Sequence, residues 1–253
     1  MSTRDLRDVT ALLGRSLRHI RRSPDTIITT AITPVVMLLL FVYVFGGAID
    51  TGEVRYVDYL LPGILLITVA SGVAYTALRL FTDLSSGILE RFRSMPIRRT
   101  AILWAHVITS LIANVVSLAV VVLVAVAIGF RSRAGVGGWL AAIAILLLFT
   151  LALTWLAVAA GLAASSPDGA GAFAYPLLFL PFVSSAFVPT SGMRPPVRWF
   201  AEHQPVTSIV ETLRRLNAGD TPGGDVWTAL GWCLGVLLLG YALGIRIYRR
   251  KLA

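Results

Sequence analysis

Long apolar runs dominate this sequence and leave it few ways to fold. Six of them cover about residues 25–46, 58–80, 101–128, 138–163, 169–188 and 226–247. A helix of about 20 apolar residues crosses a bilayer and keeps its backbone polar groups bonded inside the hydrocarbon. The charged share of 14%, against about 25% in soluble domains, and the mean hydropathy of +0.80 agree with this. We therefore expect an all-α integral membrane protein with six transmembrane helices in one domain, residues 1–253.

The N-terminal residues 1–22 are polar and rich in arginine, and they lack the apolar stretch of a signal peptide. At helical spacing their apolar side chains form one stripe, which consists of Leu6, Val9, Leu13, Leu17 and Ile20. Arginines lie roughly opposite that stripe. The pattern predicts an amphipathic helix on the membrane surface, in contact with lipid headgroups.

Prolines predict where the spans are irregular. Pro34 favours a kink in the first span, and Pro176 with Pro181 predict a broken fifth span. The long segment 189–225 that follows holds enough apolar residues for two short helices, the second opened by Pro205.

Most of the 22 basic residues fall before residue 25, between spans two and three, or after residue 245. Basic residues accumulate on the cytoplasmic side of membrane proteins. We therefore expect both termini in the cytoplasm. Lys251 is the only lysine beside many arginines, which suggests a GC-rich genome, and so a bacterial cytoplasmic membrane.

Several classes of function are disfavoured by what the sequence lacks. Without a second lysine, no P-loop motif ending in Gly-Lys-Ser/Thr exists, so the chain has no such ATP site. Cys233 is the only cysteine, and the three histidines share no ligand spacing, so we expect no metal or other cofactor. The basic N-terminus lacks interleaved aromatic residues, which disfavours nucleic acid.

The chain is also not expected to be an enzyme or an ion-driven transporter. None of the 13 acidic residues falls in the middle of a span, whereas ion-coupled transporters usually need buried carboxylates. A dyad of Ser184 or Ser185 with His203 is a weak alternative, because the Gly-x-Ser-x-Gly elbow is missing.

The loop between spans two and three, residues 81–100, is the most unusual charged segment. Apolar Ile88, Leu89 and Phe92 alternate there with Glu90, Arg91 and Arg93, and Pro96 would end a short helix. Such a helix fits a groove of a cytoplasmic ATPase that supplies energy. By composition alone, a basic loop that only binds lipid headgroups fits about as well.

Three stretches, taken in order, resemble a known family. They are Gly87-Ile88-Leu89-Glu90-Arg91 with Pro96-Ile97, the run of residues 182–189 ending in Pro189, and residues 197–205 followed by Val210-Glu211-Thr212-Leu213-Arg214. Together they resemble the membrane-spanning subunit of type-2 ABC exporters, the daunorubicin-resistance-type permeases. The resemblance covers nearly the whole chain. One departure is Gln204, where the family usually has Asn before Pro205.

The resemblance implies an interfacial helix in residues 1–22, six spans, and two short outer re-entrant helices between spans five and six, in 189–225. It also implies a permease dimer, with a second copy or a related permease, and two P-loop ATPase subunits that hold ATP and Mg. Carried over by position, the ATPase-coupling residues would be Gly87, Leu89, Glu90, Arg91, Phe92, Arg93 and Pro96. The outer gate would include Pro189, Trp199, Pro205, Glu211 and Arg214. The cargo path would follow the dimer interface, along spans one, two and five.

The spans consist mainly of Leu, Val, Ala and Ile, which favours a hydrophobic or amphipathic cargo such as a drug, an antibiotic or a lipid. A lipid-linked polysaccharide is the alternative cargo, because six Trp and seven Tyr are present. A membrane scaffold that moves nothing is a third hypothesis, and the proline-broken spans count against it.

Overall fold

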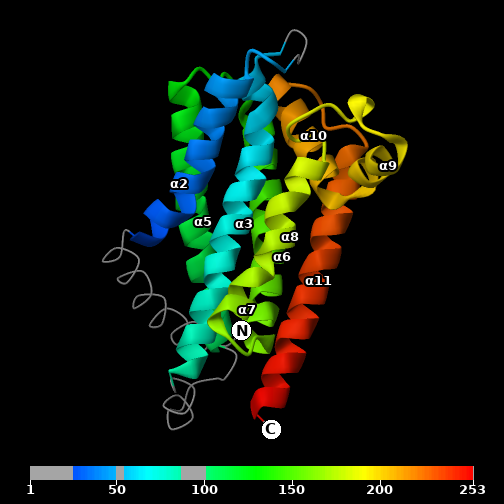
Figure 1. Ribbon diagram of the computed structural model, residues 1–253. Helices are drawn as coiled ribbons and strands as arrows, with labels where there is room; N and C mark the ends of the chain where they lie inside the picture. The colour runs from blue at the N-terminus through cyan, green and yellow to red at the C-terminus, as the bar shows by residue number, and fades with distance from the viewer. Residues whose placement is uncertain (1–24, 50–53, 87–100, 253) are drawn as a thin grey trace.

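The computed structural model describes residues 25–49, 54–86 and 101–252, and every regular element in these ranges is helical (Figure 1). The elements are α2 (Asp25–Leu40), η1 (Phe41–Phe45), α3 (Tyr56–Ser85), α5 (Ala101–Ala127), α6 (Val136–Ala163), α7 (Pro167–Ala172), α8 (Ala174–Phe179), η2 (Leu180–Val183), η3 (Thr190–Gly192), α9 (Pro195–His203), α10 (Pro205–Ala218) and α11 (Asp225–Leu252). The expected all-α class is confirmed. The expected interfacial helix in residues 1–22 lies outside the described residues.

Four helices are long and apolar enough to cross a membrane: α3, α5 from Leu103, α6 and α11 up to Lys251. They match the second, third, fourth and sixth predicted spans, with ends shifted by up to five residues. The first predicted span corresponds to α2 and η1, whose described apolar part, Thr30–Phe45, is shorter. Pro34 lies within α2, and the wider π-helical turn follows it at η1.

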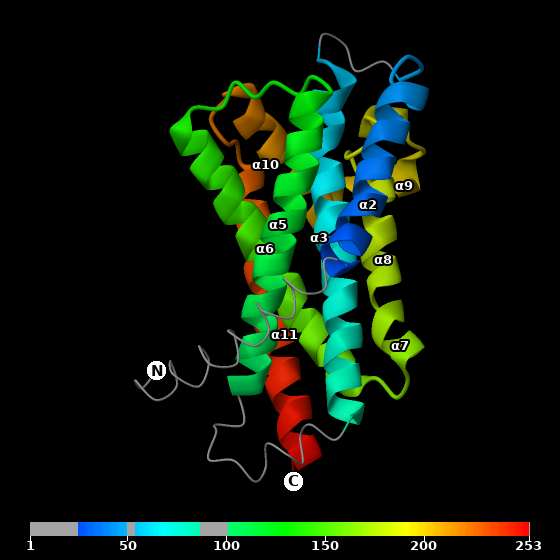
Figure 2. The same cartoon turned by 90° about the vertical axis from the view of Figure 1, so that its left-hand side faces the viewer.

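Helix α3 is the centre of the bundle. Every residue in 60–70 is buried, because α2, α5, α6 and the α7–α8 segment pack around it (Figures 1 and 2). Helix α11 differs, since it packs mainly on α6 and leaves large apolar side chains such as Leu238 exposed. An exposed leucine face on a long helix is typical of contact with lipid.

Glycines let the long helices approach closely. A Cβ atom at Gly161 of α6 would lie 2.6 Å from the Ala77 oxygen of α3. At Gly240 of α11, a Cβ atom would lie 2.8 Å from the Leu156 nitrogen of α6. Small residues at such crossings allow backbones to pack without lipid between them. These two contacts fix α6 between α3 and α11.

The fifth predicted span is interrupted, as its prolines indicated. It consists of α7, α8 and η2, which run from the end of the bundle where α3 finishes toward the end where α9 and α10 lie (Figure 1). Ser166 caps α7 by accepting a 3.1 Å hydrogen bond from the Gly169 nitrogen. Pro176 lies in α8 and Pro181 in η2.

Two short helices, α9 and α10, follow the fifth segment, as expected. Pro205 occupies the first turn of α10, and the Gln204 side chain caps that helix by accepting from the Val206 nitrogen at 3.0 Å. Gly219, with φ of +87°, ends α10 in the left-handed conformation that glycine adopts without strain. Figure 1 shows both helices at the end of the bundle where α3 and α11 begin. This end is called the outer end, after the topology that the sequence predicts.

The loop expected at residues 81–100 starts later than predicted. Helix α3 continues to Ser85, because Thr82 donates to the Leu78 oxygen at 3.0 Å and Leu84 packs in the cluster around Trp155. Polar side chains that bond the backbone of their own helix extend it beyond the apolar run. The apolar pattern alone therefore placed the end of this helix too early.

Candidate functional site

The outer cluster consists of Tyr59, Ser185, Glu211 and Arg214. The Arg214 side chain donates hydrogen bonds to the Glu211 carboxylate at 2.7 Å, the Ser185 carbonyl at 3.0 Å and the Tyr59 carbonyl at 3.1 Å. Its guanidinium also lies 3.7 Å from the centre of the Tyr59 ring. The side chain is only 17% exposed. A guanidinium so engaged joins three separate pieces of chain.

The members of the outer cluster come from three parts of the chain. Tyr59 lies in the first turn of α3, Ser185 in the turn after η2, and Arg214 near the end of α10. The Tyr59 hydroxyl closes the triangle by donating to the Ser185 carbonyl at 2.9 Å. Glu211 is one helical turn before Arg214, the spacing that places two side chains on one face. The cluster therefore connects α10 to the central helix.

A second set of bonds holds the start of α10 to the same turn. The Thr207 hydroxyl accepts from the Ser185 nitrogen at 3.3 Å and donates to the Ala201 carbonyl. The Gln204 amide donates to the Val183 carbonyl at 3.4 Å. Ser185, Gln204 and Thr207 are buried, where hydrogen bonds are costly to break.

The predicted outer-gate residues divide into two groups. Pro205, Glu211 and Arg214 all belong to α10, the last two within the outer cluster. Pro189 precedes η3, and Trp199 is 65% exposed on α9, where its ring stacks on His203. The structure therefore brings together the α10 residues and places Trp199 on an outward face.

A surface ion pair supports α9. Arg198 donates to the Glu202 carboxylate at 2.7 Å, four residues along the helix. This hydrogen bond, with smaller contributions from the charges of Arg198 and His203, keeps the pKa of the Glu202 carboxyl below its ordinary value. The pair is exposed on both sides, so it orders α9 more than it stabilises the fold.

The predicted ATPase-coupling residues lie outside the described part of the chain. They are Gly87, Leu89, Glu90, Arg91, Phe92, Arg93 and Pro96. The described chain stops at residue 86, just after α3, and resumes at Ala101 with α5. Figure 1 shows the end of α3 at the end of the bundle opposite α9 and α10. Their role stays a prediction.

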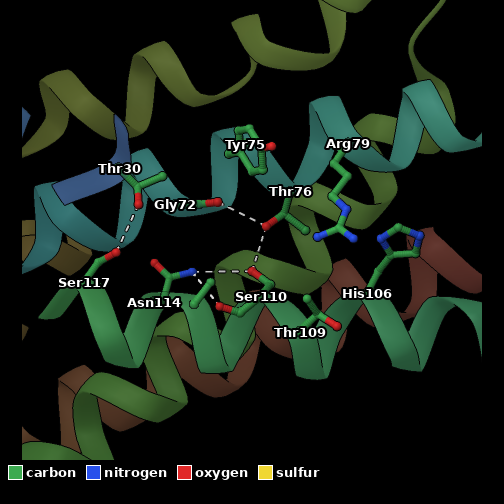
Figure 3. A pocket seen from close by; sticks show the side chains of 11 residues that line it. Thr30, Gly72, Tyr75, Thr76, Arg79, His106, Thr109, Ser110, Asn114 and Ser117 are labelled. Atoms are coloured by element: carbon green, nitrogen blue, oxygen red, sulfur yellow. Dashed lines mark hydrogen bonds between the residues drawn. The ribbon is translucent and has the colours of Figure 1, made fainter. Parts of the chain in front are cut away.

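A polar cavity that the apolar pattern concealed lies between α2, α3 and α5 (Figure 3). This inner cavity has a volume of about 30 Å³. It is lined by polar or small residues, which are Thr30, Gly72, Tyr75, Thr76, Arg79, His106, Thr109, Ser110, Ala113, Asn114 and Ser117. Figure 3 shows Thr30 with Ser117 at one end and Arg79 with His106 at the other. Polar residues at this depth of a membrane bundle are expensive and commonly functional.

Hydroxyl groups bond across the helices along the inner cavity. The Thr76 and Ser110 hydroxyls lie 2.7 Å apart, and those of Thr30 and Ser117 lie 3.0 Å apart. Asn114 donates to the Ser110 carbonyl at 3.0 Å. The two hydroxyl pairs join α2 and α3 to one face of α5, opposite exposed side chains such as Val115, while the Asn114 bond lies within α5.

The sequence carried a signal for this cavity. His106, Ser110, Asn114 and Ser117 are spaced by four, four and three residues, which places them on one face of a helix. Taken alone, His106 is typical of a packed histidine. The four residues together form a polar face on an otherwise apolar span, and this pattern indicates a polar contact inside the bundle.

Among the described residues, neither Ser184 nor Ser185 is hydrogen-bonded to His203, and no cluster of metal ligands is present. The Ser184 hydroxyl donates to the Pro181 carbonyl at 2.6 Å, and the His203 ring stacks on Trp199, so the two are not a dyad. Within residues 25–49, 54–86 and 101–252, no three side chains of His, Cys, Asp or Glu gather as metal ligands would.

Comparisons with known proteins agree with this geometry. A family model described as ABC-2 type transporter matches residues 7–216. The daunorubicin resistance ABC transporter permease protein DrrB1 of Streptomyces coeruleorubidus is 29% identical over 243 residues, 94% of this chain and 85% of the relative. The probable doxorubicin resistance ABC transporter permease protein DrrC of Mycobacterium tuberculosis is 26% identical, over 92% of this chain and 86% of the relative. A putative transport permease, ycf38 of Porphyra purpurea, is 27% identical over 83% of this chain and 73% of the relative.

Proposed function

This chain belongs to the ABC-2 type transporter family as a membrane permease, and we propose that it exports a hydrophobic or amphipathic compound using energy from a separate ATPase. The observation that carries the proposal is the family match, which extends from residue 7 to the last turns of α10. Members of the family are transport subunits whose ATPase is another chain. The partner subunits would bind ATP and Mg, and this chain would supply the path.

The names of the relatives support the cargo class. Two of them are named for resistance to daunorubicin and doxorubicin. Large apolar side chains are exposed along α2, η1 and α8, including Ile32, Tyr43, Tyr175 and Phe179. Such a surface suits an apolar or amphipathic compound better than a sugar chain.

The proposed topology has six spans with both termini in the cytoplasm of a bacterial cell. Helix α2 with η1 would be the first span, and α7, α8 and η2 together the fifth. Helices α9 and α10 would be the two re-entrant helices on the outer side, where they begin at prolines and remain short. The excess of basic residues at the opposite end supports this orientation.

The coupling segment is proposed to be residues 87–96. Glu90, Arg91 and Arg93 would contact charged groups of the ATPase, while Leu89 and Phe92 would fill a groove. Gly87 and Pro96 would bound the short helix. Helix α3 connects this segment to the outer cluster, because it ends at Ser85 and begins three residues before Tyr59. A push at one end of α3 would therefore reach Arg214.

The outer gate is proposed to be α10 with the turn at Ser185. Opening would separate Arg214 from the Tyr59 and Ser185 carbonyls, so the outer cluster would act as the latch of the closed state. Pro189 and Trp199 would form the neighbouring outer surface. A second permease copy, or a related permease, would complete the path along α2, α3 and α8, with two ATPase subunits below.

Co-purification tests the coupling proposal. The tagged chain is extracted gently from its native membrane, and its partners are identified by mass spectrometry. We expect a stoichiometric P-loop ATPase that is lost with Glu90→Ala. Glu202→Ala, an acid at the opposite end of the bundle, is the control and should keep the ATPase. A chain that purifies without any ATPase would contradict the proposal.

A further inference from the structure

Arg79 is an arginine of the inner cavity that has no anionic partner among the described residues. It is partly buried, and Figure 3 shows its guanidinium extending from α3 beside His106. Asp83 lies one turn further along α3, but its carboxylate is 3.3 Å from the His106 ring nitrogen. In the described part of the chain, Arg79 has neither a hydrogen bond nor an ion pair. A partly buried charge without a counter-ion is unfavourable, so an external anion would stabilise it.

Thr109 supplies a second group that lacks a partner. It is 5% exposed, it lines the same cavity, and its hydroxyl has no hydrogen-bond partner among the described residues. A buried hydroxyl without a partner costs about 1–3 kcal/mol. Thr109 lies one helical turn from His106, at the end of the cavity where Arg79 lies (Figure 3). Two donors, one charged and one neutral, are therefore available there.

Asn114 is unlike these two donors. Its carbonyl oxygen also lacks a hydrogen-bond partner among the described residues, but it packs against Gly72 so closely that a Cβ atom there would lie 2.2 Å away. Packing against the glycine accounts for its position. Arg79 and Thr109 are therefore the groups that offer hydrogen-bond donors at this end of the cavity. Such a site favours a ligand that accepts hydrogen bonds.

The shape of the cavity limits how a ligand enters. Its volume of about 30 Å³ matches one water-sized group. Its lining residues Gly72, Tyr75, Arg79, His106 and Ala113 are partly exposed, so it opens on the surface of the bundle. Helix α2 covers α3 and α5 only over the half nearer the outer end (Figure 2). One oxygen of a larger molecule fits, while the rest of the molecule stays outside.

We propose that the inner cavity binds the anionic oxygen of an amphiphile, a phosphate or a carboxylate, that lies in the leaflet at the inner end of the bundle. Arg79 pairs with the charge, and Thr109 donates a hydrogen bond to the same group. A guanidinium is well suited to both anions because its donors form a fork. The amphiphile is either a phospholipid of that leaflet or an acidic cargo. The inference rests on the proposed function only for which side of the membrane this end faces.

Native mass spectrometry of the purified full chain tests the proposal. The chain is titrated with phosphatidylglycerol and, separately, with phosphatidylcholine of the same acyl chains. We expect one phosphatidylglycerol to bind at least tenfold more tightly than phosphatidylcholine. Arg79→Gln should remove this preference, and Thr109→Val should weaken binding several-fold. Arg79→Lys, which keeps the charge, should retain part of the preference and controls for misfolding.

Arg246 provides the matched control. It is an exposed arginine of α11, the helix that ends at this end of the bundle, and it lies outside the cavity lining. Arg246→Gln removes the same charge and should leave the preference unchanged. Equal loss in Arg79→Gln and Arg246→Gln would overturn the proposal, because it would reduce the effect to general surface charge. An unchanged preference in Arg79→Gln would overturn it as well.

Competition identifies the source of the anion. Tighter binding of oleate than of phosphatidylglycerol would assign the cavity to an acidic cargo, and the reverse would assign it to a phospholipid; either result supports the proposal. Full displacement of the lipid by millimolar inorganic phosphate would overturn it, because the site would then bind a free anion. Since these titrations use the permease alone, they stand even if no ATPase partner is found.

Discussion

Two arginines at opposite ends of the bundle have contrasting surroundings. Arg214 in the outer cluster donates to three acceptors and lies over the Tyr59 ring. Arg79 in the inner cavity has no such partner within the residues described, and the nearby Asp83 engages His106. Both are at least partly buried, so the same side chain has acceptors within the described residues in one place and none in the other.

The two arginines differ in whether the described chain supplies acceptors for their hydrogen bonds. A guanidinium with its acceptors built into the chain holds neighbouring elements together, as Arg214 holds α10 to α3. A guanidinium that has no acceptor among the described residues can donate to a ligand. Under the proposed function, the bundle would be held closed at the outer end and open to a ligand at the inner end, as expected of an exporter before cargo binds.

The largest loss of stability is expected in the outer cluster. Arg214→Gln would remove the cation that pairs with Glu211 and two hydrogen bonds to the Tyr59 and Ser185 carbonyls, which lowers the free energy of unfolding by about 3 kcal/mol. Thermal unfolding in detergent measures this. Arg215→Gln, the adjacent residue in an exposed 3.4 Å pair with Asp225, should cost under about 1 kcal/mol. Equal losses of stability in the two variants would show that the outer cluster does not hold α10 to α3.

The next effect concerns the packing of the inner cavity. At an exposed helix position, replacing glycine by alanine would stabilise the helix. At Gly72, however, the added Cβ would lie 2.2 Å from the Asn114 oxygen. Overpacking of this kind costs about 1–3 kcal/mol. Gly72→Ala should therefore lower the thermal midpoint, and adding Asn114→Ala should recover part of the loss. A single Gly72→Ala variant as stable as the parent would mean that α3 and α5 separate easily at this point.

A smaller effect distinguishes satisfied from unsatisfied hydroxyls within the cavity. Ser110→Ala removes a group 2.7 Å from the Thr76 hydroxyl and should cost about 1 kcal/mol. Thr109→Val removes a hydroxyl that has no partner among the described residues and should leave the stability unchanged or raise it. Equilibrium unfolding of the two variants in the same detergent makes the comparison. A greater loss for Thr109→Val would indicate that its hydroxyl already has a partner.

The smallest effect is expected at the exposed pair on α9. The hydrogen bond from Arg198 lowers the pKa of Glu202, so the pair contributes above the ordinary carboxyl pKa and loses its contribution as the pH falls through the lowered value. Arg198→Gln should raise this pKa toward its ordinary value, as followed by carboxyl NMR of labelled glutamate. The thermal midpoint at neutral pH should not change. A clear fall of the thermal midpoint would show that the ion pair on α9 also stabilises the packing at the outer end.

Much of the fold could be predicted from apolar run length and proline placement. Pro205 marked the start of α10, and Pro176 with Pro181 marked the broken fifth segment, because proline removes a backbone donor wherever it stands. The end of α3 was misplaced, since Thr82 and Ser85 extend the helix through local bonds that apolar patterning does not register.

The site was predictable only in part. Glu211 and Arg214 could be singled out by a family pattern, but their contacts with Tyr59 and Ser185 join residues more than 20 positions apart. Such contacts depend on how the helices pack. The inner cavity was missed for a related reason, because Thr76 and Ser110 become partners only when α3 and α5 cross beside Gly72.

Transport by the reconstituted complex tests the central claim most directly. The chain is placed in liposomes with its co-purified ATPase, and the movement of a fluorescent hydrophobic compound is followed after ATP is added outside. We predict ATP-dependent accumulation inside the vesicles, abolished by Glu90→Ala and retained in Glu202→Ala. Accumulation that proceeds without ATP on an ion gradient, or that survives Glu90→Ala at full rate, would contradict the account.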